Sequence, residues 1–226
     1  MTPTLSIVIP TYNEEAAIGP LLAHLAEAGA EEIVVVDGNS ADRTAEIVRS
    51  AGVRLLQMPP CRALQMNAGA RASRGDALLF LHSDVRLGTG ALAAIRGALC
   101  DPEVAGGNLD IVYDGGDFAA ACFTGINRLR RRWGIFYGDS GIYCRRERFE
   151  SLGGFQPWPI LEDYDFARRL WRSGKLAFLD VPIYVSARRW KNSGLFATMW
   201  TWFLIQGLYA LGMPPHRLAR LYRAVR

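Results

Sequence analysis

The order of apolar segments in the first hundred residues constrains the fold more than any other feature. Short apolar runs at Leu5–Pro10, Ile33–Val36, Val53–Gln57 and Ala77–Leu81 alternate with stretches of helical periodicity. The run at Ile33–Val36 shows no polar alternation, as expected for a strand covered by helices on both faces. This βαβαβαβ order predicts an α/β fold with a mainly parallel, Rossmann-like sheet and right-handed crossovers. The third helix is expected over Ala63–Ala72, and Ser40 is expected to cap the second, which ends at Gly52.

Beyond Asp101 the alternation ends and a different organisation begins. The remaining pattern predicts a subdomain packed on the first half, followed by C-terminal helices. The expected elements are strands over Gly106–Val112 and Tyr143–Cys144, and helices over Phe118–Trp133, Arg146–Leu152 and Glu162–Ser173. In the last helix acidic residues occupy the first turn, where the helix dipole favours them. With 226 residues, we expect a single domain.

Charge and cysteine usage exclude several classes of protein. The formal net charge of +4 comes almost entirely from arginine, and no reading helix, zinc finger or aromatic single-strand platform accompanies it, so no nucleic-acid partner is expected. The cysteines are far apart without paired spacing, which argues against a zinc site or a disulfide framework. No charged leader and apolar stretch precede Leu5, so we expect no signal peptide and a cytoplasmic location.

Polar residues gather where the predicted strands end. Thr11–Glu14 follows the first strand, and Asp37–Ser40 follows the second. In open parallel sheets, ligands bind outside the carboxyl ends of the strands, so these residues are candidates for binding. No Gly-x-Gly-x-x-Gly follows the first strand, which excludes the simplest dehydrogenase. Further polar clusters occur at Arg62–Gly75, His82–Asp84 and Glu162–Asp165.

Taken together, these clusters resemble the family 2 glycosyltransferases, which have the GT-A fold. The resemblance covers roughly residues 4 to 190. It implies a nucleotide-sugar-binding half over 1–100, an acceptor and catalytic half over 101–190, and C-terminal helices over 191–226. The residues implied for donor binding are Pro10, Thr11, Tyr12, Glu14, Asp37, Arg62, Asn67, Ser83, Arg189 and Trp190.

The resemblance also implies the residues of the reaction itself. Asp163, with Glu162 beside it, matches the general base, and Asp84 matches the last carboxylate of a metal-binding Asp-x-Asp motif. His82 replaces the first carboxylate, and it is either a ligand or a hydrogen-bonded neighbour of the site. The divalent metal is expected to be Mn²⁺ or Mg²⁺. The acceptor side is implied to include Gly138, Asp139 and Trp158.

Two further departures from the family pattern bear on function. Gly38 stands where a second aspartate is frequent, and Arg189-Trp190 lacks the glutamine of the processive polymerases. Transfer of a single sugar is therefore expected. The resemblance to the family favours a UDP-sugar as the donor. The chemistry agrees: a metal neutralises the departing diphosphate, a carboxylate deprotonates the acceptor hydroxyl, and direct displacement inverts the anomeric centre.

Two other functions remain open at this level. A sugar-nucleotide or nucleotidyl transferase would have a Gly-rich basic loop after the first strand, which Thr11–Glu14 does not provide. A degenerate, non-catalytic nucleotide-sugar-binding module would retain the fold without turnover. The intact Asp84 and Asp163 argue against that second function.

The C-terminal segment leaves two interpretations open. Leu195–Met213 is apolar and aromatic, and arginines follow it at every third position from Arg217 to Arg226. This pattern suits peripheral contact with the inner face of a membrane, with a lipid or lipid-linked acceptor. It equally suits a core-covering helix or a homodimer interface with solvated arginines. The arginines of the run Arg128–Arg132 are expected to be solvated, with binding of an anionic acceptor as the alternative.

Overall fold

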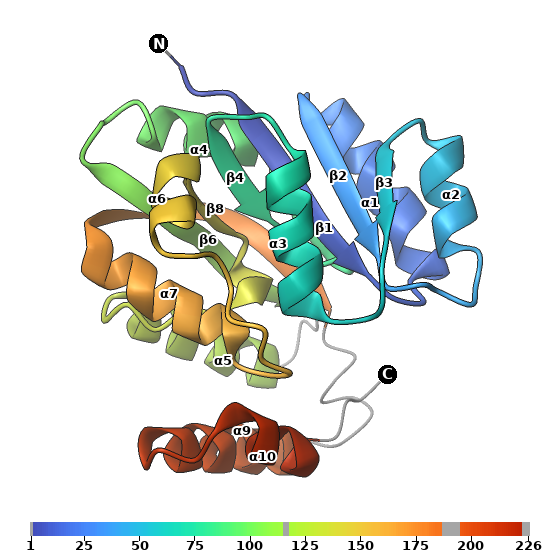
Figure 1. Ribbon diagram of the computed structural model, residues 1–226. Helices are drawn as coiled ribbons and strands as arrows, with labels where there is room; N and C mark the ends of the chain where they lie inside the picture. Colours follow the sequence, from blue (N-terminus) through green and yellow to red (C-terminus); the bar gives the residue numbers. More distant parts are fainter. Residues whose placement is uncertain (1, 115–117, 187–194, 223–226) are drawn as a thin grey trace.

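The computed structural model describes residues 2–114, 118–186 and 195–222. Its centre is an eight-stranded mixed sheet in the order β3-β2-β1-β4-β7-β6-β8-β5, with helices on both faces (Figure 1). The strands are β1 Leu5–Thr11, β2 Glu32–Asp37, β3 Arg54–Gln57, β4 Ala77–Phe80, β5 Val85–Leu87, β6 Val104–Asp114, β7 Ile142–Arg145 and β8 Lys175–Ser186. The helices are α1 Glu15–Glu27, α2 Thr44–Ser50, α3 Arg62–Ala72, α4 Ala91–Ala98, α5 Phe118–Arg131, α6 Arg146–Ser151, α7 Glu162–Ser173, α9 Leu195–Ala210 and α10 Pro215–Leu221, with a 3₁₀ turn, η1, at Gly138–Ser140.

The N-terminal half confirms the predicted parallel arrangement. β1 pairs in parallel with β2 and with β4, and β2 pairs in parallel with β3. The predicted cap of the second helix at Ser40 is wrong, because α2 begins at Thr44 and its N-cap residue is Arg43. The Ser40 side chain is instead bonded to Asp37, so the chain forms a turn before the helix starts.

The second half of the sheet is mixed. β7 pairs antiparallel with β4 and with β6, whereas β6 and β8 run parallel. Neither β5 nor β8 is evident from the sequence pattern. β8 contains Pro182, which lacks an N–H group, and the ladder between β6 and β8 shifts register between Asn108 and Asp110, close to that proline.

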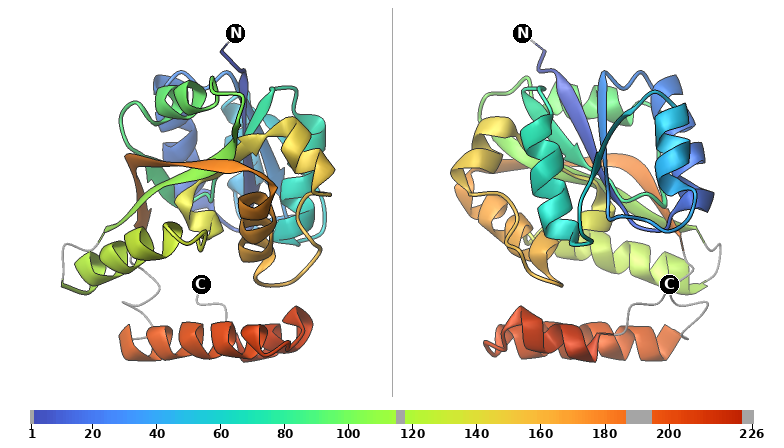
Figure 2. Two further views of the ribbon diagram at one scale, coloured as in Figure 1. Left: turned by 90° about the vertical axis from the view of Figure 1, so that its left-hand side faces the viewer. Right: turned by 45° about the vertical axis from the view of Figure 1, so that its right-hand side comes forward.

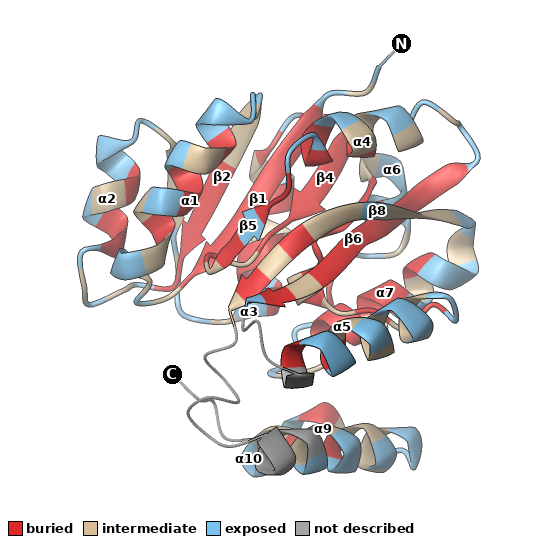
Figure 3. Ribbon diagram, turned by 180° about the vertical axis from the view of Figure 1, so that it is seen from behind, coloured by how far each residue is buried: buried red, intermediate tan, exposed pale blue. Residues whose placement is uncertain are grey.

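Two apolar cores lie on opposite faces of the sheet, in which β1, β4 and β6 are buried along most of their length (Figure 3). One core joins α1, α2, α4 and α5 to the sheet and includes Ile18, Leu92 and Phe123. The other joins α3, α6 and α7 and includes Met66 and Phe166. α3 and α7 therefore share a face, and their first residues can meet.

The α9–α10 hairpin crosses beneath the body of the molecule, close to α5 and α7 (Figure 2). Ring contacts join it to the body: Trp202 lies 5.5 Å from Phe123 of α5, and Tyr209 lies 5.9 Å from Tyr164 of α7, between ring centroids. Among the described residues, no helix is long and apolar enough to cross a membrane.

Candidate active site

The carboxyl ends of β1, β2 and β3 bring three polar residues into line. Thr11 pairs with Asp37 in the ladder, and Asp37 pairs with Gln57. Thr11 and Asp37 are both buried, as is the neighbouring Pro10 of β1. The predicted donor-binding residues at the first two strand ends are therefore adjacent, at the edge where ligands bind in sheets of this type.

The Asp37 carboxylate organises the loop that follows β2. It accepts hydrogen bonds from the Ser40 backbone N–H at 3.0 Å and from Gln57 Nε2 at 3.3 Å, and it is also bonded to the Ser40 hydroxyl. Thr11 Oγ1 lies 3.4 Å from the same carboxylate. Asp37 thus has a clear structural role, and its contact with a nucleotide base stays a prediction.

Gln65 is a site-forming residue that the sequence did not single out. Its buried Nε2 donates to the carbonyl oxygens of Thr11, at 2.9 Å, and Val36, at 2.8 Å. It therefore holds together the ends of β1 and β2 from the first turns of α3. The only signal in the sequence is a polar residue on the apolar face of a helix, which is too general to reveal its two partners.

The loops after β1 and β2 are locked to each other. Asn13 N donates to Ser40 Oγ at 2.8 Å, and Asn13 Oδ1 accepts from Ala41 N at 2.9 Å. Glu14 N donates to Thr44 Oγ1 at 2.8 Å. Asn13 has a φ of 54° and Asn39 of 57°, in the left-handed region that asparagine tolerates better than most residues. The candidate donor loops are thus held by a dense set of bonds.

Gly38 occupies a narrow space beside the predicted base-binding residue Tyr12. A Cβ at Gly38 would lie 3.1 Å from both Tyr12 Cδ2 and Pro60 Cβ. A second aspartate at this position would crowd the Tyr12 ring. The departure from the family pattern at Gly38 therefore has a steric explanation in this chain.

Arg62 and Glu162 form an ion pair that joins the first residues of α3 and α7. The Glu162 side chain is 1% exposed and that of Arg62 is 42% exposed, so one partner lies inside and the other reaches solvent. Burial raises the pKa of Glu162, Arg62 opposes this, and the neighbouring Asp163 adds to it. The charges of Asp163 and Asp139 also act on Arg62.

Asp163 is held in a defined orientation at the start of α7. Its Oδ2 accepts the Gly138 N–H at 2.8 Å, and its Oδ1 accepts the Tyr164 N–H at 2.7 Å. A Cβ added at Gly138 would lie 2.9 Å from His82 Nε2 and 3.1 Å from Asp163 Oδ2. The structure thus brings together Asp163, Gly138 and His82, which come from three distant segments.

The residues around this group restrain it further. Leu161, just before α7, has a φ of 63°, a conformation that costs a bulky residue about 1–3 kcal/mol. Tyr137 precedes Gly138 in the chain and Tyr164 follows Asp163. Their rings stack, with 5.6 Å between ring centroids. Burial raises the pKa of Tyr137, so its hydroxyl stays neutral. Such over-determined geometry is common where a carboxylate must be oriented.

His82, Ser83 and Asp84 lie in the turn between β4 and β5, with Ser83 buried and its two neighbours partly exposed. Among the described residues, no three His, Cys, Asp or Glu side chains gather in a group that could hold a metal ion. One carboxylate with one imidazole would still suit a Mg²⁺ or Mn²⁺ ion that takes its other ligands from phosphate and water. The donor set therefore fits a metal that arrives with the nucleotide.

Among the remaining predicted residues, one has a packing role, one contacts the C-terminal hairpin and two lie outside the described part of the chain. Asn67 exchanges two hydrogen bonds with the Phe155 backbone, at 2.8 and 2.9 Å, which is a packing role, and its donor contact stays a prediction. Trp158 lies 6.3 Å from Tyr209 between ring centroids, on the side of α7 and α9. Arg189 and Trp190 lie outside the described residues.

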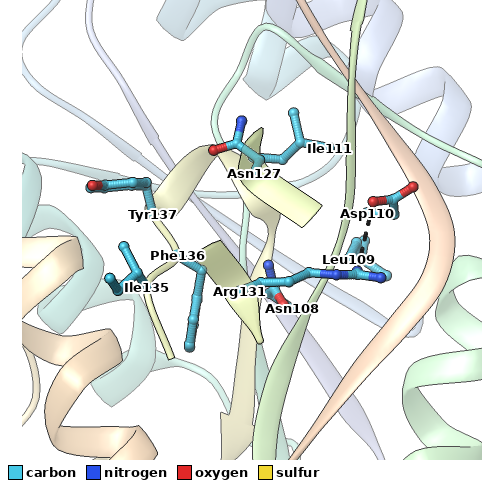
Figure 4. A pocket seen from close by; sticks show the side chains of 9 residues that line it. All are labelled: Asn108, Leu109, Asp110, Ile111, Asn127, Arg131, Ile135, Phe136 and Tyr137. Carbon is cyan, nitrogen blue, oxygen red and sulfur yellow. Dashed lines mark ion pairs between the residues drawn. The ribbon is translucent and has the colours of Figure 1, made fainter. Parts of the chain in front are cut away.

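The arginines of α5 are not uniformly solvated, and that expectation is wrong for Arg131, whose side chain is 11% exposed; Arg128 is exposed but ion-paired. Arg128 binds the buried Asp110 through Nε and Nη2, and Arg131 also pairs with Asp110 at 3.7 Å and with Asp180. Figure 4 shows Arg131 and Asp110 at a cavity of only about 10 Å³, enough for a single water. This cavity is too small for a sugar, and these arginines anchor α5 to the sheet.

The fold and the site together define an α/β protein with buried polar residues at the carboxyl ends of β1 and β2 and a backbone-held carboxylate at the start of α7. Residues 6–153 match the family model described as glycosyl transferase family 2. The chain belongs to this family.

Curated relatives match only part of the chain. An undecaprenyl-phosphate 4-deoxy-4-formamido-L-arabinose transferase of Pseudomonas aeruginosa is 37% identical over 95 residues, 36% of this chain and 28% of the relative. A dolichyl-phosphate hexose transferase of Haloferax volcanii is 48% identical over 58 residues, 25% of each protein. The chain spans about a quarter to a third of the length of the curated relatives it matches.

Solved structures match over more of the chain and show the fold. A mannosyltransferase from Pyrobaculum calidifontis, in complex with GDP-Man and Mn²⁺, superposes with a TM-score of 0.71 at 22% identity, over 98% of this chain and 68% of that one. Residues 1–349 of TarS from S. aureus, with UDP-GlcNAc, superpose with a TM-score of 0.68 at 20% identity, over 81% and 58%. The expected GT-A fold is confirmed.

Proposed function

We propose that this chain transfers a single sugar from a nucleoside-diphosphate sugar to an acceptor hydroxyl, with inversion at the anomeric carbon. The observation that carries the proposal is the position of Asp163, which the Gly138 N–H holds at 2.8 Å beside His82. Membership of glycosyl transferase family 2 supports the same chemistry.

Asp163 is proposed as the general base. Each of its oxygens accepts one backbone N–H, which leaves a second lone pair on each for an acceptor hydroxyl. The acceptor oxygen loses its proton to Asp163 and bonds to the anomeric carbon, while the bond from that carbon to the diphosphate breaks. A base of this kind contributes ~10²–10⁴ in rate.

Glu162 and Arg62 are proposed to position the donor. The Arg62 side chain is paired with Glu162 and is 42% exposed, so its guanidinium can also contact a phosphate. Asp84 and His82 would hold a divalent metal, which when bound neutralises charge on the departing diphosphate. Thr11, Tyr12 and Glu14 would contact the nucleoside from the loop after β1.

Donor binding can be tested before any acceptor is known. Thermal shifts are measured with UDP- and GDP-sugars, with and without Mn²⁺, because one structural relative is a complex with UDP-GlcNAc and another a complex with GDP-Man. A donor at 100 times its dissociation constant would add about 2.7 kcal/mol of stability. Asp84→Ala should lose the metal-dependent shift while unfolding cooperatively, and His82→Ala should lose less if the imidazole is not a ligand.

The result separates this function from its alternatives. No metal-dependent shift with any nucleotide sugar, or an equal shift in Asp84→Ala, would contradict the assignment. Release of free sugar and nucleoside diphosphate from a bound donor would exclude a non-catalytic binding module. Formation of pyrophosphate from a nucleoside triphosphate and a sugar phosphate would instead indicate a nucleotidyl transferase.

A lipid or lipid-linked acceptor is part of the proposal. Two of the relatives are named for undecaprenyl phosphate and dolichyl phosphate. In this chain the α9–α10 hairpin exposes Trp200, Phe203 and Leu211. Exposed aromatic and aliphatic side chains of this kind suit the interfacial region of a bilayer. A homodimer through the same residues is the competing arrangement.

A further inference from the structure

An arginine-lined cleft separates α7 from the turn between α9 and α10. Its volume is about 430 Å³. α7 contributes Asp165, Arg168, Arg169 and Arg172, which recur at helical spacing and therefore share one face of the helix. The buried residues Phe166, Ala167 and Leu170 occupy the other face. The cleft thus lies outside the core and apart from the Gly138–Asp163 contact.

The charges in the cleft do not cancel. Asp165 is paired with Arg169, whose Nε and Nη2 lie 2.8 and 2.7 Å from its Oδ2, and Arg169 also donates to the carbonyl oxygens of Leu152 and Gly154. Arg168 and Arg172 have no carboxylate partner in the part of the chain that the structure describes. Two exposed guanidinium groups therefore face the same space with their charge uncompensated.

Arg168 is held in place by a neutral partner. Its Nη1 donates to Tyr164 Oη at 3.1 Å, and its guanidinium lies 5.8 Å from the centroid of the Tyr164 ring. The Tyr164 ring packs in turn against Tyr137 and Tyr209. A guanidinium fixed by a hydroxyl keeps its other donors available for an anion at a low entropic cost.

The opposite wall offers no competing anion. It consists of Tyr209, Ala210, Gly212, Met213, Pro214 and Pro215. Burial raises the pKa of the Tyr209 hydroxyl, with Asp165 and Tyr164 adding to the effect and the arginines opposing it, so this hydroxyl is a neutral donor. Two guanidinium groups and a hydroxyl donor are the groups that recognise a phosphate oxygen by charge-assisted hydrogen bonds.

We propose that the cleft between α7 and the α9–α10 turn binds a phosphate group through Arg168, Arg172 and the Tyr209 hydroxyl. The bound anion would tie the hairpin to the body of the protein across a cleft that now holds mainly like charges. Leu211, 85% exposed, adjoins the cleft-lining residues Ala210 and Gly212, so a phosphate entering here can come from a lipid headgroup or from a soluble molecule.

The test compares two double variants of the full chain that have the same net charge. Arg168→Gln/Arg172→Gln removes the two unpaired guanidinium groups, whereas Arg71→Gln/Arg148→Gln removes two exposed arginines of α3 and α6. Binding of inorganic phosphate is measured by calorimetry with saturating UDP and Mn²⁺, and again with GDP, so that the donor site is occupied. Cooperative unfolding verifies each fold, and Arg172→Gln alone serves if the double variant does not fold.

We expect saturable phosphate binding by the wild type and the control, weakened roughly ten-fold or more in Arg168→Gln/Arg172→Gln. Vesicles of phosphatidylcholine with and without phosphatidic acid then distinguish the source. Phosphatidic-acid binding that is lost with the same two arginines assigns a lipid headgroup, and phosphate binding without vesicle binding assigns a soluble ligand. The absence of saturable phosphate binding, or equal affinities in the two double variants, would overturn the proposal.

Discussion

The backbone N–H of Gly138 donates a 2.8 Å hydrogen bond to Asp163 Oδ2. This single contact joins η1, in the middle of the chain, to the first turn of α7, and it brings the carboxylate next to His82. A backbone donor cannot rotate away as a side chain can. The orientation of Asp163 is therefore set by the fold itself.

Asp163→Asn should lower sugar transfer by ~10²-fold or more while donor binding stays close to that of the wild type. The amide keeps the size of the side chain but cannot accept a proton, so only transition-state stabilisation is lost. Transfer rates and donor affinity are measured side by side. Asp165→Asn is the matched control, because Asp165 is paired with Arg169 on another face of the same helix. An active Asp163→Asn with an inactive Asp165→Asn would show that the base is misassigned.

Gly138→Ala should lower kcat by roughly 10- to 100-fold without unfolding the protein. The added methyl would lie 2.9 Å from His82 Nε2 and 3.1 Å from Asp163 Oδ2, so one of these groups must move. Gly97→Ala in α4 is the control, because its methyl would meet no atom within 4 Å. That control should stabilise the protein by about 0.4–1 kcal/mol and leave kcat unchanged. Equal kcat values in the two variants would contradict the proposed geometry.

Much of the sheet could be predicted from the sequence, because buried parallel strands appear as uninterrupted apolar runs. This holds for the strands at Leu5, Ile33 and Ala77. β8 was not predicted, since Pro182 interrupts it and its pairing depends on a register shift in β6. The start of α2 was placed too early because the Ser40 hydroxyl is bonded to Asp37 in a turn, and α2 begins only at Thr44.

The candidate site was predictable only where its residues stand at strand or helix ends. Thr11, Asp37 and Glu162 were found for that reason. Gln65, Tyr137 and Tyr209 were not, because their roles depend on partners in distant segments. The roles of Arg128 and Arg131 depend likewise on Asp110, which local periodicity does not connect to α5.

The buried charge of Glu162 predicts a pH effect on stability. Burial is the main cause of its raised pKa, so the folded protein holds this proton more tightly than the unfolded chain, whose value is about 4.5. The stabilisation from the protonated form is complete below that value and is lost as pH rises through the folded-state pKa. The free energy of unfolding of the wild type should therefore fall, relative to Glu162→Gln, as pH rises from about 4.5.

Urea unfolding of both proteins over a pH series measures this difference. Glu150→Gln is the control, because it removes an exposed carboxylate and leaves the buried Glu162 in place. The prediction is wrong if the free energies of unfolding of the wild type and Glu162→Gln change in parallel with pH, or if the wild type becomes relatively more stable as pH rises. Either result would show that Arg62 fully compensates the buried carboxylate.

Two exposed aromatic residues of α9 are candidates for contact with a membrane that carries the acceptor. Trp200 is 66% and Phe203 72% exposed, and their rings lie 6.3 Å apart, so they form one apolar patch. If this patch enters a bilayer interface, Trp200→Ser/Phe203→Ser should reduce sedimentation with anionic vesicles by roughly ten-fold, because each buried aromatic contributes about 1.5–3 kcal/mol before the costs of ordering. Trp133→Ser, at a site that is 71% exposed beyond the end of α5, should retain binding. Analytical ultracentrifugation of the same variants measures the oligomeric state. If the wild type is a dimer that Trp200→Ser/Phe203→Ser dissociates, and no variant binds vesicles, the patch is a homodimer interface and not a membrane contact.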